Sequence, residues 1–157
     1  MPPRGWDLLD QWFPEAARAM ALLGAELLLF LTAIGSEPSP APPLDSKEHR
    51  QRTQQGHAAA NLLPLIASNR YGVERSLQES QGIFIRFSGS SFIAVPTGAK
   101  TAEAVEEGEA VLVQRFDLAE IAERRAGRCV FRDRCPDLYS PILTLDGLTV
   151  NGGQPAR

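Results

Sequence analysis

The sequence predicts an α/β fold in which helices are layered on a sheet. A helix is expected at residues 14–23, because Pro14 suits the first helical turn and Glu15 complements the positive end of the helix dipole. This helix leads into the apolar run 27–31, which is typical of a strand covered on both faces. A helix that leads directly into such a strand favours a layered α/β architecture.

Further elements are expected along the chain. Four prolines make the segment 35–44 irregular. Asp45 has the position of a helix N-cap, with Glu48 as its reciprocal partner, and this helix is expected to end near Ala60. A strand at 62–68 follows, and Pro64 indicates that it begins late or lies near an edge. The later predictions are a turn at 69–72, a polar loop at 73–82, strands at 83–87, 91–95, 110–116 and 142–145, turns at 88–90 and 96–98, and a helix at 118–126.

Composition and charge narrow the functional class. The 157 residues are enough for one core, and a net charge of -3 gives no electrostatic footprint for nucleic acid. The most apolar run, 27–34, is too short to span a membrane, and Asp7, Asp10 and Glu15 interrupt any signal-peptide pattern. We therefore expect a cytoplasmic protein with no nucleic-acid or membrane partner.

An ordered set of motifs covers residues 10–147. It opens with Asp-Gln-Trp-Phe-Pro-Glu-Ala-Ala-Arg at 10–18. The later motifs are the segments 32–38, 55–61, 67–70, 89–94, 96–98, 131–134, 136–139 and 143–147. In this order and at this spacing, the set closely resembles the N-carbamoylputrescine amidases of the nitrilase (carbon–nitrogen hydrolase) superfamily.

The resemblance implies a particular domain organisation. It implies the C-terminal half of the nitrilase-type αββα sandwich, with a partial carbon–nitrogen hydrolase domain at 10–147. Residues 1–9 then form a divergent leader, and residues 148–157 a disordered tail. Half of such a sandwich is expected to leave the strand 27–31 with an exposed face or an unpaired edge.

The resemblance also implies a chemistry, which is the hydrolysis of linear amide-type C–N bonds. In the family a cysteine thiolate attacks the carbonyl carbon, a glutamate moves protons and a lysine stabilises the oxyanion. The ungapped alignment puts Leu8 at the cysteine position, and a shifted alignment puts Gly5 there. The glutamate and lysine belong to the N-terminal half of the family domain. We therefore assign no catalytic residue, and the resemblance implies neither a metal nor another cofactor.

Four residues are candidates for binding a small amide or amine substrate. Thr32 has hydrogen-bonding capacity in the loop that faces the family pocket, and Glu37 is placed to pair with a cationic amine, unless it is a solvated loop acid. Asn69 and Arg70 end a strand, where α/β proteins commonly hold ligands. The alternative for Asn69 and Arg70 is turn capping and an internal ion pair.

Other nucleophiles and bases are less favoured. Cys129 and Cys135 lie more than a hundred residues after the nucleophile position and follow a helix, so we interpret them as incidental reduced thiols. His49 and His57 are eight residues apart on one predicted helix, but without a nucleophile they are expected to be solvent-facing or part of the core.

Three functional hypotheses remain open. The chain is an inactive half domain that docks on full-length homologues or on copies of itself. Alternatively, it is an active amidase that works in trans or with residues from a longer gene. The third hypothesis is a non-catalytic module that binds a small amine.

Overall fold

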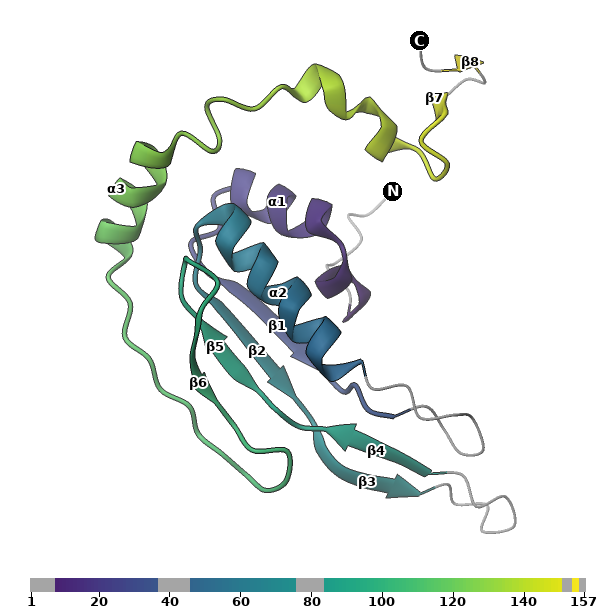
Figure 1. Cartoon of the computed structure of the whole chain (residues 1–157), viewed down its shortest axis with the longest axis vertical. Coiled ribbons are helices and arrows are strands. Elements are labelled where there is room, and N and C mark those ends of the chain that lie inside the picture. The colour runs from purple at the N-terminus through teal and green to yellow at the C-terminus, as the bar shows by residue number, and fades with distance from the viewer. Residues whose placement is uncertain (1–7, 37–45, 76–83, 151–153, 156–157) are drawn as a thin grey trace.

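A computed structural model describes residues 8–36, 46–75, 84–150 and 154–155 of the chain. In these ranges the fold is mixed α/β, with helices on one face of a four-stranded sheet (Figure 1). The helices are η1 (Leu8–Trp12), α1 (Pro14–Leu22), α2 (Lys47–Asn61), α3 (Leu118–Arg128) and η3 (Pro136–Leu143). The strands are β1 (Leu28–Thr32), β2 (Leu65–Asn69), β3 (Tyr71–Arg75), β4 (Phe84–Ser88), β5 (Phe92–Ala94), β6 (Lys100–Glu103), β7 (Thr149–Val150) and β8 (Gln154–Pro155).

The first two predicted helices are confirmed. α1 begins at Pro14, and the chain leaves the helix through Gly24, whose φ of 97° favours glycine. The N-cap of α2 is Ser46 and not Asp45, and the Ser46 side chain makes no capping hydrogen bond. Asp45 lies outside the described residues. α2 ends at Asn61, one residue after the predicted end.

The main sheet has the strand order β1-β2-β5-β6. β1 and β2 are parallel, and β5 runs antiparallel to both β2 and β6. β2 begins after Pro64, as predicted, but it is a central strand and not an edge strand. The strand β6 was not predicted.

β1 is covered by the helices on one face only. Leu28 and Phe30 are buried in the core, whereas Leu29 is 60% exposed and Leu31 is 77% exposed. The prediction of a strand covered on both faces is therefore wrong for this chain. The exposed face that we expected for half a sandwich is present.

A polar hairpin replaces the predicted turn at 69–72 and the start of the predicted loop at 73–82. β3 pairs antiparallel with β4, and residues 76–83 lie outside the described ranges. The β3 side chains face solvent on both sides of the hairpin, so their sequence is polar and lacks the alternating pattern that predicts a strand. The hairpin is joined to the β1 exit by a bridge between Gly35 and Phe87. A Cβ on Gly35 would lie 2.3 Å from the Arg86 carbonyl oxygen, so the approach needs glycine.

The predicted strands 83–87 and 91–95 are confirmed as β4 and β5, but they belong to different sheets. Gly89 and Ser90 have φ of 51° and 54°, and they redirect the chain from one sheet to the other. A Cβ on Gly89 would lie 2.3 Å from the Glu106 carbonyl oxygen. This turn therefore also packs against the segment that follows β6.

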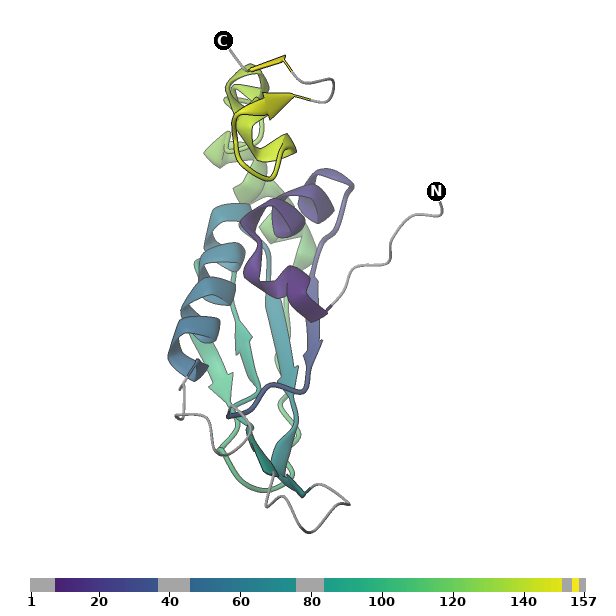
Figure 2. The same cartoon turned by 90° about the vertical axis from the view of Figure 1, so that its right-hand side faces the viewer.

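The C-terminal third runs along the outside of the molecule (Figures 1 and 2). The predicted helix at 118–126 is confirmed as α3, and Asp117 caps it by accepting a hydrogen bond from the Glu120 amide at 3.0 Å. The predicted strand at 110–116 is wrong, because this extended segment pairs with no strand of the described residues and Val111 is 89% exposed.

The end of the chain also differs from the prediction. The predicted strand at 142–145 is wrong, because Pro136 and Pro141 lie in the 3-10 helix η3, which ends at Leu143. Disorder stays a prediction for the tail 148–157, whose described residues include the short pair β7–β8. Residues 151–153 and 156–157 lie outside the described ranges. No helix of the described residues is long and apolar enough to cross a membrane.

Candidate functional site

The parallel pairing of β1 and β2 brings two of the predicted residues together. Thr32 and Asn69 are register partners at the carboxyl ends of these strands. The Thr32 hydroxyl donates a hydrogen bond to Asn69 Oδ1 at 2.8 Å. This polar cluster lies on the helix-covered side of the sheet, because Leu28, Phe30 and Thr32 alternate with the exposed positions of β1.

The Asn69 amide is fully used by the protein. Oδ1 also accepts a hydrogen bond from the Ile34 amide at 2.8 Å. Nδ2 contacts the Ile34 carbonyl, the Ser88 hydroxyl and the Gly89 carbonyl, each at 3.0 Å, and Asn69 is 8% exposed. Asn69 thus joins the β1 exit to the turn between β4 and β5. The amide has no capacity left for a ligand in this arrangement.

Arg70 lies at the surface of the hairpin. Its Nη1 forms an ion pair with Glu74 Oε2 at 2.5 Å, and its guanidinium carbon lies 4.4 Å from the centre of the Phe87 ring. The ion pair expected as the alternative role of Arg70 is therefore present. Glu37, the fourth candidate, lies outside the described residues.

Arg50 is a member of this cluster that sequence reasoning missed. It projects from α2, is 0% exposed, and its Nη1 lies 3.5 Å from Thr32 Oγ1. Burial lowers the pKa of Arg50, and the charge of Glu103 acts in the opposite direction. The helical spacing of residues along α2 could have indicated Arg50, because it places Arg50 on the buried face of the helix. This face consists of Arg50, Gln51, Gln54, His57, Ala58 and Asn61. A polar face of this kind is ordinarily assigned to solvent.

α2 also anchors the turn that begins at Leu8. Gln54 Nε2 donates to Gln11 Oε1 at 2.8 Å, and His57 Nε2 lies 2.9 Å from the Gln11 carbonyl oxygen. The Trp12 ring packs edge-on against His49, with ring centres 5.2 Å apart. The two histidines thus contact different residues of η1 and do not act as a pair of general bases.

Burial lowers the pKa of His57 below its ordinary value of about 6.5. The backbone hydrogen bond with Gln11 and the charge of Glu15 act in the opposite direction but are smaller effects. His57 is 4% exposed, so its neutral form is the one that the fold accommodates.

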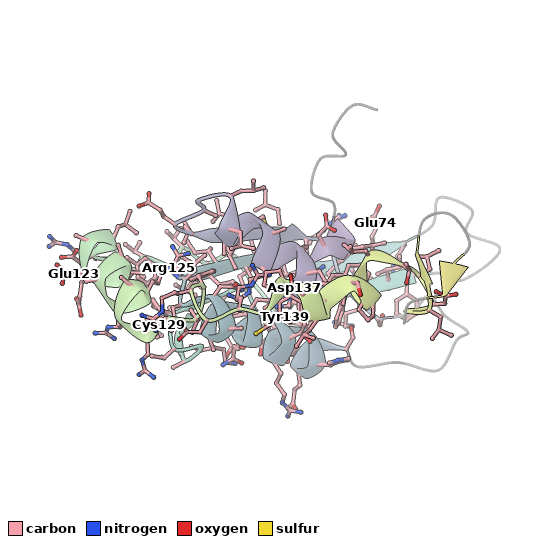
Figure 3. The ribbon with its side chains drawn as sticks, turned by 90° about the horizontal axis from the view of Figure 1, so that it is seen from above. Glu74, Glu123, Arg125, Cys129, Asp137 and Tyr139 are labelled. Atoms are coloured by element: carbon pink, nitrogen blue, oxygen red, sulfur yellow. The ribbon has the colours of Figure 1, made fainter. Side chains whose placement is uncertain are left out.

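The two cysteines lie outside this cluster, Cys129 at the end of α3 and Cys135 at the start of η3. Both are free thiols, and Cys129 follows α3 with its Sγ 3.6 Å from the Gly127 carbonyl. Figure 3 shows Cys129 and Arg125 at the opposite end of the molecule from Glu74 of β3. Over the described ranges, no group of three or more His, Cys, Asp or Glu is arranged to hold a metal ion.

A sheet with a polar cluster at the carboxyl ends of its parallel strands is the arrangement of many ligand-binding α/β domains. Residues 9–126 match the carbon–nitrogen hydrolase family, and the chain belongs to this family. It is 58% identical over 138 residues to the N-carbamoylputrescine amidase of Solanum tuberosum, covering 88% of this chain and 46% of that protein. It is 54% identical to the citrullinase of Francisella tularensis, over 85% of this chain and 45% of that protein.

A solved structure confirms the predicted fold class. The crystal structure of a carbon–nitrogen hydrolase from Helicobacter pylori G27 superimposes with a TM-score of 0.74 and 40% identity. The match covers 87% of this chain and 47% of that protein. The chain thus spans about half the length of the curated relatives it matches.

We expect Asn69→Ala to destabilise the fold by about 3 kcal/mol, because it removes hydrogen bonds from the partly buried Ile34 amide and the buried Gly89 carbonyl. The matched control is Arg70→Ala, which removes an exposed ion pair and is expected to cost less than about 1 kcal/mol. Urea denaturation of the two variants measures the difference. Equal losses would contradict the role given to Asn69.

Stability is expected to fall as the pH drops below about 6.5, because the unfolded chain binds a proton at His57 that the folded chain resists. Above this pH both states hold neutral His57, and its contribution is fully present. Melting temperatures between pH 8 and pH 5 measure the effect. His57→Gln should reduce the fall in melting temperature at acid pH. The same substitution at the exposed His49 should leave that fall as in the parent chain. An unchanged fall in the melting temperature of His57→Gln at acid pH would show that another group controls it.

Proposed function

We propose that this chain forms half of a carbon–nitrogen hydrolase domain that cleaves the C–N bond of a linear carbamoyl compound, N-carbamoylputrescine in the first instance. The observation that carries the proposal is 58% identity to N-carbamoylputrescine amidases over 138 residues of this chain. A cytoplasmic location for this activity is part of the proposal.

The chemistry of the family is covalent catalysis. A thiolate adds to the carbamoyl carbon, one of its two nitrogens leaves with a proton as amine or ammonia, and water then hydrolyses the remaining thiocarbamate to a carbamic acid, which breaks down to carbon dioxide and the other amine. In this chain the nucleophile position is Leu8, the first residue of η1. Leucine has no lone pair to donate. We propose that the chain contributes the anchored turn and the Thr32 side of the site, and that it is inactive alone.

The purified chain is expected to release no ammonia from N-carbamoylputrescine above the buffer rate. The loss of a nucleophile alone costs about a million-fold in rate. A coupled ammonia assay, with a full-length amidase of this family as positive control, measures the release. Ammonia release that rises in proportion to the concentration of this chain would refute the proposed inactivity.

Docking on a full-length homologue is the second candidate function. The observation that favours it is the exposed apolar face of β1, formed by Leu29 and Leu31. In the described part of the chain β1 pairs with β2 alone, so its outer edge is also open. Open edges and exposed apolar faces of strands promote association with another chain.

Leu29→Glu combined with Leu31→Glu is expected to abolish co-elution with a full-length homologue in gel filtration, because two charges would be buried in the contact. The matched control is Leu23→Glu on the helix side, where Leu23 is 81% exposed. It should co-elute like the parent chain. A parent chain that elutes as a stable monomer in the presence of the homologue would argue against docking.

A further inference from the structure

A hollow of about 970 Å³ lies between the helical layer of the fold and the C-terminal segment. Side chains of α1 and α2 form one wall, and residues between 130 and 143, which include η3, form the other. Seen from above, Tyr139 of η3 lies over these two helices (Figure 3). Pockets that hold small organic ligands have volumes of about 300–1,000 Å³, so this hollow has the size of such a site.

Apolar side chains form much of the lining. Leu22 of α1 is 48% exposed, and Ile142 and Leu143 of η3 are 57% and 76% exposed. Each of these side chains keeps apolar surface in water that a ligand in the hollow would cover. Removing apolar surface from water is a main favourable contribution to binding in such pockets. The lining therefore favours a ligand with an apolar body.

Two arginines line the same hollow and have no carboxylate partner among the described residues. Arg18 of α1 donates from Nη2 to the Ala60 carbonyl oxygen at 2.7 Å and lies over the Phe131 ring. Its Nη1 has no hydrogen-bond partner in the described part of the chain. Arg134 is half-buried, and its guanidinium carbon lies 5.4 Å from the centre of the Tyr139 ring. Both cations thus rest against aromatic rings beside the apolar lining.

The two guanidinium groups repel one another across the hollow. Burial lowers the pKa of Arg18, and the charge of Arg134 lowers it further. An anion held between two like charges relieves their repulsion and replaces the hydration that burial removes. The other two half-buried or buried arginines, Arg125 and Arg50, do not line this hollow. The position of Arg18 and Arg134 in one pocket is what distinguishes them.

The remaining charged residues of the hollow limit the charge of the ligand. Arg52 is paired with Glu48, and Asp133 is bound by Arg132 at 2.6 Å. Glu15 lies exposed in the first turn of α1 and opposes a highly charged anion. Two unpaired cations and one acid leave a net charge of about +1, which matches a carboxylate better than a phosphate ester.

We propose that the hollow between α1, α2 and η3 binds a small organic monocarboxylate with an apolar body, and that Arg18 and Arg134 hold its carboxylate. The apolar body then lies against Leu22 and Ile142. The ligand joins the C-terminal segment to the helical layer, because it contacts both. This proposal does not depend on the proposed function, since neither Thr32 nor Asn69 lines the hollow.

The test uses three probes with one alkyl chain and different head groups, which are octanoate, octanamide and octylammonium. Isothermal titration calorimetry of the 157-residue chain measures each Kd. Octanoate is expected to bind about tenfold more tightly than the neutral amide, because hydrogen bonds to charged groups are stronger than neutral ones. Octylammonium should show no binding, since its charge is repelled by both arginines.

Hydrogen exchange locates the bound octanoate. The ligand must leave before η3 separates from α1, so octanoate at about ten times its Kd should slow exchange in η3 about tenfold. Exchange in the β3–β4 hairpin, which does not line the hollow, is the internal control and should not change through local opening. Binding elsewhere on the surface would leave exchange in η3 as in the free chain.

Variants assign the carboxylate to the arginines. Arg134→Gln should weaken octanoate binding about tenfold and leave octanamide binding unchanged. Arg134 makes no hydrogen bond or ion pair within the described ranges, so this variant is expected to fold. Arg132→Gln removes the same charge two residues away, at an exposed position that does not line the hollow. As the matched control, it should keep the parent Kd to within about twofold.

Four results would overturn the proposal. The first is the absence of octanoate binding to the parent chain. The second is equal affinity for octanoate and octanamide, which would show a greasy surface without a carboxylate site. The third is an unchanged octanoate Kd in Arg134→Gln. The fourth is a dimer, seen by sedimentation velocity, that excludes octanoate, which would make a second copy the occupant. None of these results bears on ammonia release, which tests the proposed function separately.

Discussion

The hydrogen bonds of the Asn69 side chain hold together the edge of the sheet at the carboxyl ends of β1 and β2. One amide connects the end of β1, the loop at Ile34 and the turn at Gly89. These segments come from distant parts of the sequence. A short polar side chain at the end of a strand supplies hydrogen bonds to the Ile34 amide and the Gly89 carbonyl, which lie outside the strands. The position of Thr32, and with it the wall of the candidate site, depends on this amide.

A second constraint is the polar underside of α2. Gln54 and His57 fix the η1 turn, whereas Arg50 and Gln51 reach the carboxyl edge of the sheet. One helix therefore sets the distance between the turn at the family's nucleophile position and the opposite wall. Polar contacts specify this distance more sharply than apolar packing would, because hydrogen bonds tolerate little change in length.

Much of the fold could be predicted from local chemistry. Pro14 and Glu15 located the start of α1, and Asn69 was correctly expected to lie at the end of a strand. The errors came from tertiary partners that the sequence does not display. In the part of the chain that the structure describes, no second layer covers Leu29, and no strand pairs with residues 110–116. β3 was missed because exposed strands carry polar residues, and Arg50 because burial of an arginine contradicts its ordinary preference.

The contact at Phe131 has a consequence for how the molecule opens. Its ring lies near both Arg18 of α1 and Arg125 of α3, and it packs against the core. Around it, α3 has no buried residue and η3 has none. Separating the C-terminal segment from the body therefore breaks few contacts and leaves the sheet intact. Hydrogen exchange in this segment should follow a low-energy local opening, while the amides of β2 exchange only on global unfolding.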